Sequence, residues 1–229
     1  MPIKFKKAKI GPENDLVNKF LKHYRKLFKT KGLEVTVLQE PFAEIGIPDI
    51  LLVVWDKAAR DAWHPDRNIL QKDDIKILHF ISGFGRRGVT IEGLCQSLSY
   101  DCNQVMKTVE RLLRADIIAG SGNLIRIKNF KKHFFIRQII SIEAKMNNWR
   151  EAMQQAQLNQ NFSSHSYVLL PEKKITSDIL SACDKKMGVL SFGSKPVLMK
   201  RAIKSKLPGS YYSWMLNEYV GRQISESNF

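Results

Sequence analysis

Three side chains in this sequence could together bind a metal ion and activate water. Glu143 and Lys145 lie two positions apart in an apolar segment that alternates strictly, which predicts a strand on which both point the same way. Asp49 stands at the start of another very apolar segment, where a carboxylate without a partner is costly to desolvate. Two carboxylates on adjacent strands can hold a hard divalent cation, and a neighbouring lysine can orient water and offset phosphate charge. Taken singly, the first two residues could equally form a surface ion pair, and Asp49 could be a turn residue.

A third acid, Glu13, is a candidate for the same site. It precedes Leu16, Val17 and Phe20 by three, four and seven residues, so it continues the apolar stripe of a predicted helix. Asp15 falls instead on the polar face of that helix. Glu13 is therefore expected to point toward the sheet, although a first-turn acid could also serve only the helix dipole.

The elements that must position these residues follow from the spacing of apolar side chains. Residues 12–28 show helical spacing, and 134–145 alternates as a strand. The polar stretch 56–71, which contains Pro65, is expected to be a linker. Further strands are expected at 33–38, 47–55, 167–170 and 187–192, and further helices at 149–162, 177–184 and 210–224.

The middle of the chain has a different pattern. Predicted helices at 75–83 and 91–98 and a third from about 101 are followed by a small hairpin around the turn 120–123. Three helices and a hairpin in this order are typical of a winged helix-turn-helix, whose third helix reads duplex DNA. The residues expected to face outward from that helix are Asn103, Gln104, Lys107 and Arg111.

The positive charge of the chain is concentrated in two stretches. The formal net charge is +15, of which residues 1–31 contribute +8 and residues 185–206 contribute +7. Such surfaces supply phosphate contacts, so a nucleic-acid partner is expected, with solvated lysine faces or a membrane surface as alternatives. The side chains expected to track the DNA backbone are Lys19, Lys22, Arg25, Lys26, Lys29, Lys200, Arg201 and Lys204.

Several other classes of protein are disfavoured by the sequence. No apolar run of about 18 residues predicts a membrane span. The stretch 83–88 is glycine-rich but lacks the strand and the Lys-Ser/Thr ending of a nucleotide loop, so no nucleotide cofactor is expected. Cys95, Cys102 and Cys183 have no metal-binding spacing and are expected to be reduced in a cytoplasmic protein. The aromatic tail at 210–224 is expected to dock on the chain itself or on a second copy in a homodimer.

The candidate residues resemble a known signature. Pro48-Asp49 followed by Glu143-Ala144-Lys145 is similar to the motif of the PD-(D/E)XK nuclease superfamily, and the order helix, three strands, helix, strand is similar too. Glu13 matches the first-helix glutamate of many members. Gln155, with Gln154 as second choice, matches the glutamine of the following helix.

This resemblance implies an α/β fold with a restriction-endonuclease-like αβββαβ core, a mixed sheet flanked by helices. It also implies that Asp49, Glu143 and the backbone carbonyl of Ala144 hold Mg²⁺, with Mn²⁺ as a substitute. Lys145 would position the attacking water, and Glu13 would bind a second ion or an outer-shell water. Gln155 would orient the lysine or the phosphate. The implied products carry a 5′-phosphate and a 3′-hydroxyl.

One departure from the family pattern has a physical explanation. From position 49 to position 143 there are 94 positions, far more than a hairpin connection needs. The excess is about the size of a winged helix, which predicts an inserted domain at 72–128 and a discontinuous nuclease-like domain at 1–71 and 129–229.

These observations favour a metal-dependent DNA endonuclease with a winged helix for DNA recognition. The alternatives are a non-catalytic DNA-binding regulator or assembly subunit on the same fold, and an RNA-processing enzyme or RNA binder.

Overall fold

The computed structural model describes residues 3–7, 10–28, 32–43, 46–58 and 63–226. The chain forms two compact units. The sheet unit comprises Ile3–Asp56 and Ile136–Tyr212, and the helical unit is built chiefly from Lys57–Phe135 and the segment from Ser213 onward. This division differs from the expected one because 57–71 and the tail belong with the helical unit.

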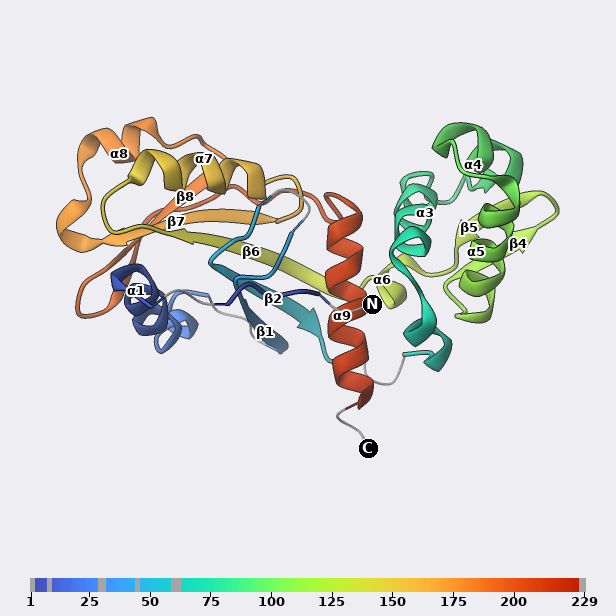
Figure 1. Cartoon of the computed structure of the whole chain (residues 1–229), viewed down its shortest axis with the longest axis horizontal. Helices are drawn as coiled ribbons and strands as arrows, with labels where there is room; N and C mark the ends of the chain where they lie inside the picture. The colour runs from blue at the N-terminus through green and yellow to red at the C-terminus, as the bar shows by residue number, and fades with distance from the viewer. Residues whose placement is uncertain (1–2, 8–9, 29–31, 44–45, 59–62, 227–229) are drawn as a thin grey trace. The chain divides into compact units, whose positions relative to one another are not determined.

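The sheet unit contains a six-stranded mixed sheet flanked by helices, so the expected α/β class is confirmed (Figure 1). Strands β6, β7 and β8 are parallel, and the other neighbouring pairs are antiparallel. The last strand was not expected, because its residues had been assigned to a basic surface segment. In spatial order the strands are β1 (Leu33–Gln39), β2 (Ile50–Asp56), β6 (Ile136–Ala144), β7 (His165–Pro171), β8 (Met187–Phe192) and β9 (Pro196–Lys200).

Helices cover both faces of this sheet. On one face lie α1 (Pro12–Leu21) and the short 3-10 helix η1 (Tyr24–Lys26), and on the other lie α7 (Trp149–Asn159) and α8 (Ser177–Ala182). The expected alternation along β6 is confirmed. Ile140, Ile142 and Ala144 join the apolar cluster under α1, while Glu143 contacts α7.

The first helix is shorter than expected. It ends at Leu21 instead of continuing to Phe28, and the chain turns through η1. This turn brings Phe28 against the ring of Tyr167 on β7, with ring centroids 5.6 Å apart. Packing on the sheet therefore overrides the helical spacing of these residues.

The inserted segment leaves and re-enters the sheet at neighbouring strands. Trp55, near the end of β2, pairs with Ile136, the first residue of β6. The segment between them therefore begins and ends at adjacent positions, which is the condition under which an insertion leaves a sheet intact.

The helical unit has its own three-stranded sheet, in the order β3-β5-β4. Two side chains cap its helices, since the Thr90 hydroxyl accepts from the Gly93 N–H and the Asp101 carboxylate accepts from the Gln104 N–H. Its elements are η2 (Pro65–Ile69), α3 (Lys72–Gly83), β3 (Val89–Thr90), α4 (Ile91–Leu98), α5 (Cys102–Arg114), β4 (Ile118–Ser121), β5 (Leu124–Ile127), α6 (Phe130–His133) and α9 (Tyr211–Glu226).

A buried ion pair explains why the expected linker belongs to the helical unit. Arg67, only 1% exposed, forms a salt bridge with Glu218 of α9 and donates to the carbonyl oxygen of His133 at 3.0 Å. Trp214 of α9 is also buried, with its ring centroid 4.9 Å from that of Phe134. The tail therefore docks on its own chain.

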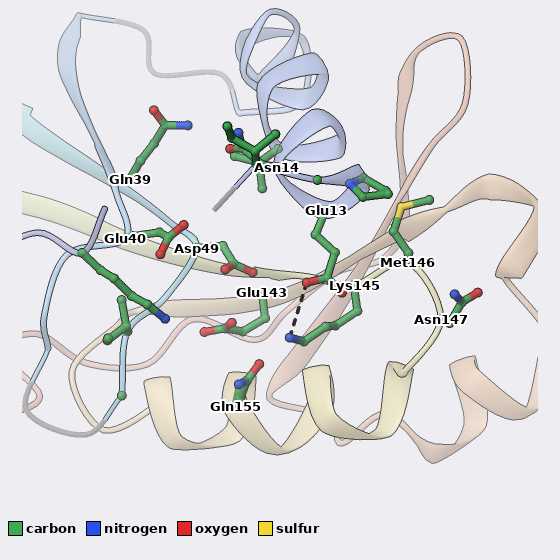
Figure 2. Close-up of a pocket in the computed structure, with 17 residues that line it drawn as sticks. Glu13, Asn14, Gln39, Glu40, Asp49, Glu143, Lys145, Met146, Asn147 and Gln155 are labelled. Atoms are coloured by element: carbon green, nitrogen blue, oxygen red, sulfur yellow. Dashed lines mark ion pairs between the residues drawn. The ribbon is translucent and has the colours of Figure 1, made fainter. Parts of the chain in front are cut away.

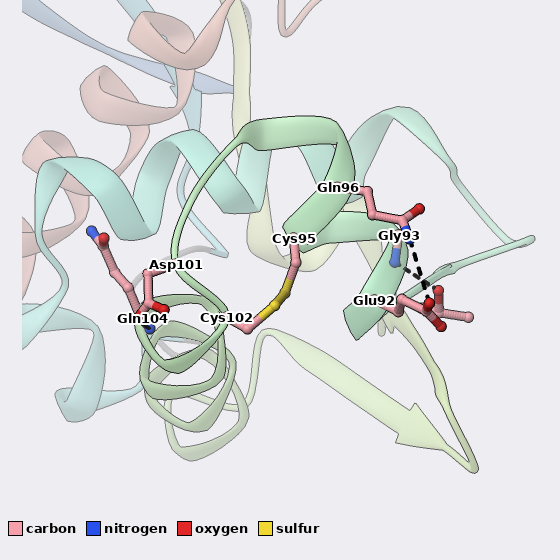
Figure 3. Close-up of a disulfide and its surroundings, with 8 residues drawn as sticks. Glu92, Gly93, Cys95, Gln96, Asp101, Cys102 and Gln104 are labelled. Atoms are coloured by element: carbon pink, nitrogen blue, oxygen red, sulfur yellow. Dashed lines mark hydrogen bonds between the residues drawn. A yellow bond between two sulfur atoms is a disulfide. The ribbon is translucent and has the colours of Figure 1, made fainter.

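The structure also corrects the expected state of the cysteines. Cys95 within α4 and Cys102 at the start of α5 form a disulfide, with their Cα atoms 5.3 Å apart (Figure 3). The tight turn between the two helices brings these thiols together, so the expectation of three reduced cysteines was wrong. Cys183 is free and buried. No helix within the described parts of the chain has the length and apolar character to cross a bilayer.

Candidate active site

A pocket of about 720 Å³ opens where α1, β2, β6 and α7 approach one another in the sheet unit. All five side chains singled out from the sequence line it, although they are separated by up to 142 positions between Glu13 and Gln155. Figure 2 shows Asp49, Glu143 and Lys145 at its centre, with Glu13 above them and Gln155 below. The pocket is lined by residues that include Glu13, Asp49, Glu143, Lys145, Gln155, Gln39 and Glu40.

The pairing of β2 with β6 positions Asp49. The two strands run antiparallel with Ile50 opposite Ile142, so Asp49 lies beside the end of β6. There the Ala144 N–H donates to Asp49 Oδ2 at 2.7 Å. A backbone donor on a neighbouring strand therefore holds one oxygen of this carboxylate in place.

Glu143 is more deeply buried than Asp49. Its side chain, on a residue only 3% exposed, lies on the α7 side of the sheet, where Asn159 Nδ2 donates to Oε1 at 2.6 Å. This contact was not expected from the sequence. Its signal was available, because Asn159 lies four residues after Gln155 and hence on the same face of the helix.

The two acids oppose each other's ionisation. Burial raises the pKa of Asp49 to about 6. Burial and the neighbouring charge of Asp49 raise the pKa of Glu143 to about 8. The Ala144 N–H, the Asn159 amide and the Lys145 ammonium offset only part of this cost. A cation between the carboxylates would offset much more of it.

Lys145 is surrounded by acids. Its Nζ lies 3.3 Å from Glu151 Oε1 and 3.7 Å from Glu13 Oε2. Burial lowers the pKa of this ammonium, but Glu13, Glu151 and Asp49 outweigh that effect, so its pKa lies above the ordinary value. The lysine is therefore cationic at neutral pH and can act as a hydrogen-bond donor.

Gln155 reaches the lysine only through another residue. Its Nε2 lies 3.5 Å from Glu151 Oε1, the same oxygen that contacts Lys145. Its own Oε1 is buried and accepts no hydrogen bond from any described residue. Glu151 and Glu40 were also missed from the sequence. Glu40 lines the pocket, and its N–H donates to the Asp49 carbonyl at 3.1 Å.

The donor chemistry of the pocket fits a hard divalent cation. The carboxylates of Asp49 and Glu143 offer oxygen ligands, which Mg²⁺ and Mn²⁺ prefer, and their mutual repulsion gives a cation a favourable position. No three acidic, histidine or cysteine side chains within the described residues are close enough to form a cage by themselves. The fitting set is thus the acid pair, with the carbonyl of Ala144 as the further ligand that the resemblance implies.

Most of the basic residues expected to contact the DNA backbone are exposed to solvent. Lys19, Lys22, Arg25 and Lys26 are exposed on α1 and η1, and Arg201 and Lys204 are exposed after β9. Lys29 lies outside the described residues.

Lys200 was expected to contact the DNA backbone, but its side chain is used within the fold. Its Nζ donates to the carbonyl oxygens of Leu180 and Cys183, at 3.1 and 2.5 Å, and so caps the end of α8. Its ammonium is used within the fold and is not placed as a phosphate contact.

Arg111 was also expected to face outward toward DNA, but its guanidinium is turned onto a neighbouring helix. Its guanidinium forms an ion pair with the fully buried Asp74, with Nε 3.0 Å from Oδ2. A buried carboxylate needs such a partner. Asn103, Gln104 and Lys107 are exposed on α5, as expected.

The raised pKa values predict how stability depends on pH in metal-free buffer. A carboxyl whose pKa is raised to about 8 in the folded state binds its proton more tightly there than in the unfolded chain. Its contribution is therefore complete below about pH 4.5 and is lost as the pH rises to about 8. We expect the free energy of unfolding of the wild type, relative to Glu143→Gln, to fall across this range by on the order of a few kcal/mol.

The measurement is urea denaturation with EDTA at several pH values. Taking the difference between the two proteins cancels the contributions of His133 and His165, whose pKa values burial lowers to about 4. Glu172→Gln, at an exposed acid, is the matched control and should track the wild type. Parallel profiles for the wild type and Glu143→Gln would contradict the prediction.

Compared with protein-family models, with curated proteins and with solved structures, the chain matches none of them.

Proposed function

We propose that the protein is a metal-dependent DNA endonuclease that hydrolyses phosphodiester bonds. One observation carries the proposal: Asp49, just before β2, and Glu143 and Lys145, at and just after the end of β6, meet in one pocket beside Glu13. Two desolvated acids in one pocket are costly to ionise, and a bound cation would stabilise their charged forms. The adjacent ammonium adds the donor that phosphate chemistry needs.

The order of elements in the sheet unit supports a restriction-endonuclease-like core. Along the chain the elements run α1, β1, β2, β6, α7, β7, which is the αβββαβ order of the PD-(D/E)XK superfamily. The motif residues lie beside two paired strands, with Asp49 just before β2, Glu143 near the end of β6 and Lys145 just after it.

Each side chain has a role in the proposed reaction. Asp49, Glu143 and the Ala144 carbonyl would hold Mg²⁺, which when bound would polarise the phosphate and lower the pKa of water. Lys145 would donate a hydrogen bond to the attacking water or to a phosphate oxygen, while Glu13 and Glu151 keep the ammonium charged. Water would add to phosphorus and the bond to the 3′ oxygen would break, with the water losing a proton and the departing oxygen gaining one from solvent, which leaves a 5′-phosphate and a 3′-hydroxyl.

The helical unit supports DNA recognition. Its order α3, β3, α4, α5, β4, β5, with the three-stranded sheet, is that of a winged helix-turn-helix inserted between β2 and β6. The exposed residues Asn103, Gln104 and Lys107 lie in the first turns of α5, the part of a recognition helix that contacts base edges. The exposed lysines of α1 and η1 would contact phosphates.

Cleavage of plasmid DNA tests the catalytic proposal. With Mg²⁺ or Mn²⁺ the wild type should cut or nick the plasmid. Lys145→Ala and Asp49→Asn should each lose activity by about a hundredfold or more, because each removes charge stabilisation at the reacting phosphate. Lys174→Ala, at an exposed lysine outside the pocket, is the control and should retain activity.

Two results would redirect the proposal. A wild type that leaves DNA intact under all conditions but shifts it in a gel would identify the non-catalytic DNA-binding alternative. Cleavage of duplex RNA in preference to DNA would identify an RNA-processing enzyme.

Charge reversal tests the proposed phosphate contacts. The double variant Lys22→Glu/Lys26→Glu should bind DNA about tenfold or more weakly, to a similar extent on unrelated sequences, because backbone contacts carry no sequence information. The slope of log affinity against log salt should become shallower by about 2, as two contacts are lost. Fluorescence anisotropy at several salt concentrations measures both quantities.

The matched control is Lys173→Glu/Lys174→Glu, an equal charge change on the 3-10 helix η3 (Glu172–Lys174) of the same unit. An equal loss of affinity in the control would show a general effect of net charge. A loss confined to some sequences would contradict the backbone role.

A further inference from the structure

The contact between Glu143 and α7 involves an amide that the proposed reaction does not use directly. Asn159 is 1% exposed, and its Nδ2 donates to Glu143 Oε1 at 2.6 Å. Among the described residues this is the hydrogen bond that fixes the Glu143 carboxylate. A buried hydrogen bond between an amide and a carboxylate is short and strong, and it restricts the orientation of both groups.

Three buried serines hold the end of α7 in place. The Ser163 hydroxyl donates to the Asn159 carbonyl at 2.7 Å, and the Ser166 hydroxyl donates to the Ala156 carbonyl at 2.5 Å. Both serines contact the Ser141 hydroxyl, each at 3.1 Å. Ser141 lies on β6, two residues before Glu143 and on the same side of the strand. The strand that carries the acid therefore also anchors the helix that carries the amide.

The donor at Glu143 is neutral, and this matters for binding a cation. The Asn159 amide holds Oε1 of Glu143 without forming an ion pair, and so leaves Oε2 for a cation that displaces the proton of this carboxyl. Asp49 is held in the same manner, by the Ala144 N–H on Oδ2. A cationic donor, such as a lysine or arginine side chain, at either carboxylate would instead compete with a metal ion for it.

We propose that Asn159 is a positioning residue that orients Glu143 for binding a divalent cation. The inference rests on the proposed function, because it assigns a supporting residue to the same site. Groups that orient metal ligands typically contribute 10–100-fold to metal affinity or activity. Gln155, the amide expected from the sequence, contacts Glu151 beside the lysine instead. Gln155 and Asn159 thus contact different parts of the site.

The test compares Asn159→Leu, which removes the donor at similar volume, with Asn159→Gln, which keeps an amide. Binding of Mn²⁺ is measured by the rise in melting temperature during a metal titration, which depends on the ratio of metal concentration to Kd. Asn159→Leu should bind Mn²⁺ about 10–100-fold more weakly than the wild type, and Asn159→Gln should recover part of that loss. In cleavage assays Asn159→Leu should need correspondingly more metal, while DNA affinity in EDTA stays unchanged.

Met153→Leu, at a buried position of α7 in the apolar cluster with Val168, is the matched control and should behave as the wild type. If Asn159→Leu does not fold, Asn159→Ala takes its place in every comparison. Wild-type Mn²⁺ affinity in the folded donor-free variant, or an equal loss in Met153→Leu, would overturn the role of Asn159 and leave the proposed function standing. A wild type that neither binds Mn²⁺ nor cleaves DNA would overturn the proposed function, and the inference with it.

Discussion

Asp49, which is partly buried, and Glu143, which is buried, are two acids in one pocket, and the charge of Asp49 raises the cost of ionising Glu143. A protein gains nothing in stability from such a pair, because an apolar pair at the same positions would avoid both desolvation and repulsion. The surrounding structure nevertheless keeps both carboxylates and supplies each with one neutral hydrogen-bond donor. The structure of the site is therefore arranged around the repulsion between these two carboxylates, which a bound cation would relieve.

The fold satisfies this constraint with few elements. Antiparallel pairing of β2 with β6 brings Asp49 to the backbone of Ala144, and the alternation of β6 turns Glu143 toward α7. Lys145, at the end of the same strand, reaches the acids of α1 and α7. The inserted helical unit does not disturb this geometry, since the chain leaves and re-enters the sheet at the paired residues Trp55 and Ile136.

Much of the site could be predicted because strand alternation and helical spacing are local properties. Glu143 and Lys145 were assigned from alternation, and Glu13 from its place on an apolar stripe. Partners distant in the sequence could not be predicted in this way. The ion pairs of Arg111 with Asp74 and of Arg67 with Glu218 depend on how helices pack, and a charged residue on a polar helix looks the same with or without such a partner.

The same reasoning explains the remaining differences. Lys200 was counted with the phosphate contacts because net charge does not reveal that its ammonium caps α8. Asn159 was not predicted, because the family motif points to Gln155, one helical turn earlier, and both amides lie on the same face of the helix. Cys95 and Cys102 were expected to be reduced, because a spacing of seven residues does not show that the turn after α4 brings the start of α5 back beside Cys95.

If the two carboxylates form a cation site, the position of a bound ion will show it. Crystals soaked with Mn²⁺ and measured at the manganese absorption edge locate the ion without any assumption about activity. The strongest anomalous peak is expected between the carboxylates of Asp49 and Glu143, and it should be lost in Glu143→Gln crystals. Ordered carboxylates without a peak at saturating Mn²⁺, or a peak bound only elsewhere on the chain, would contradict it.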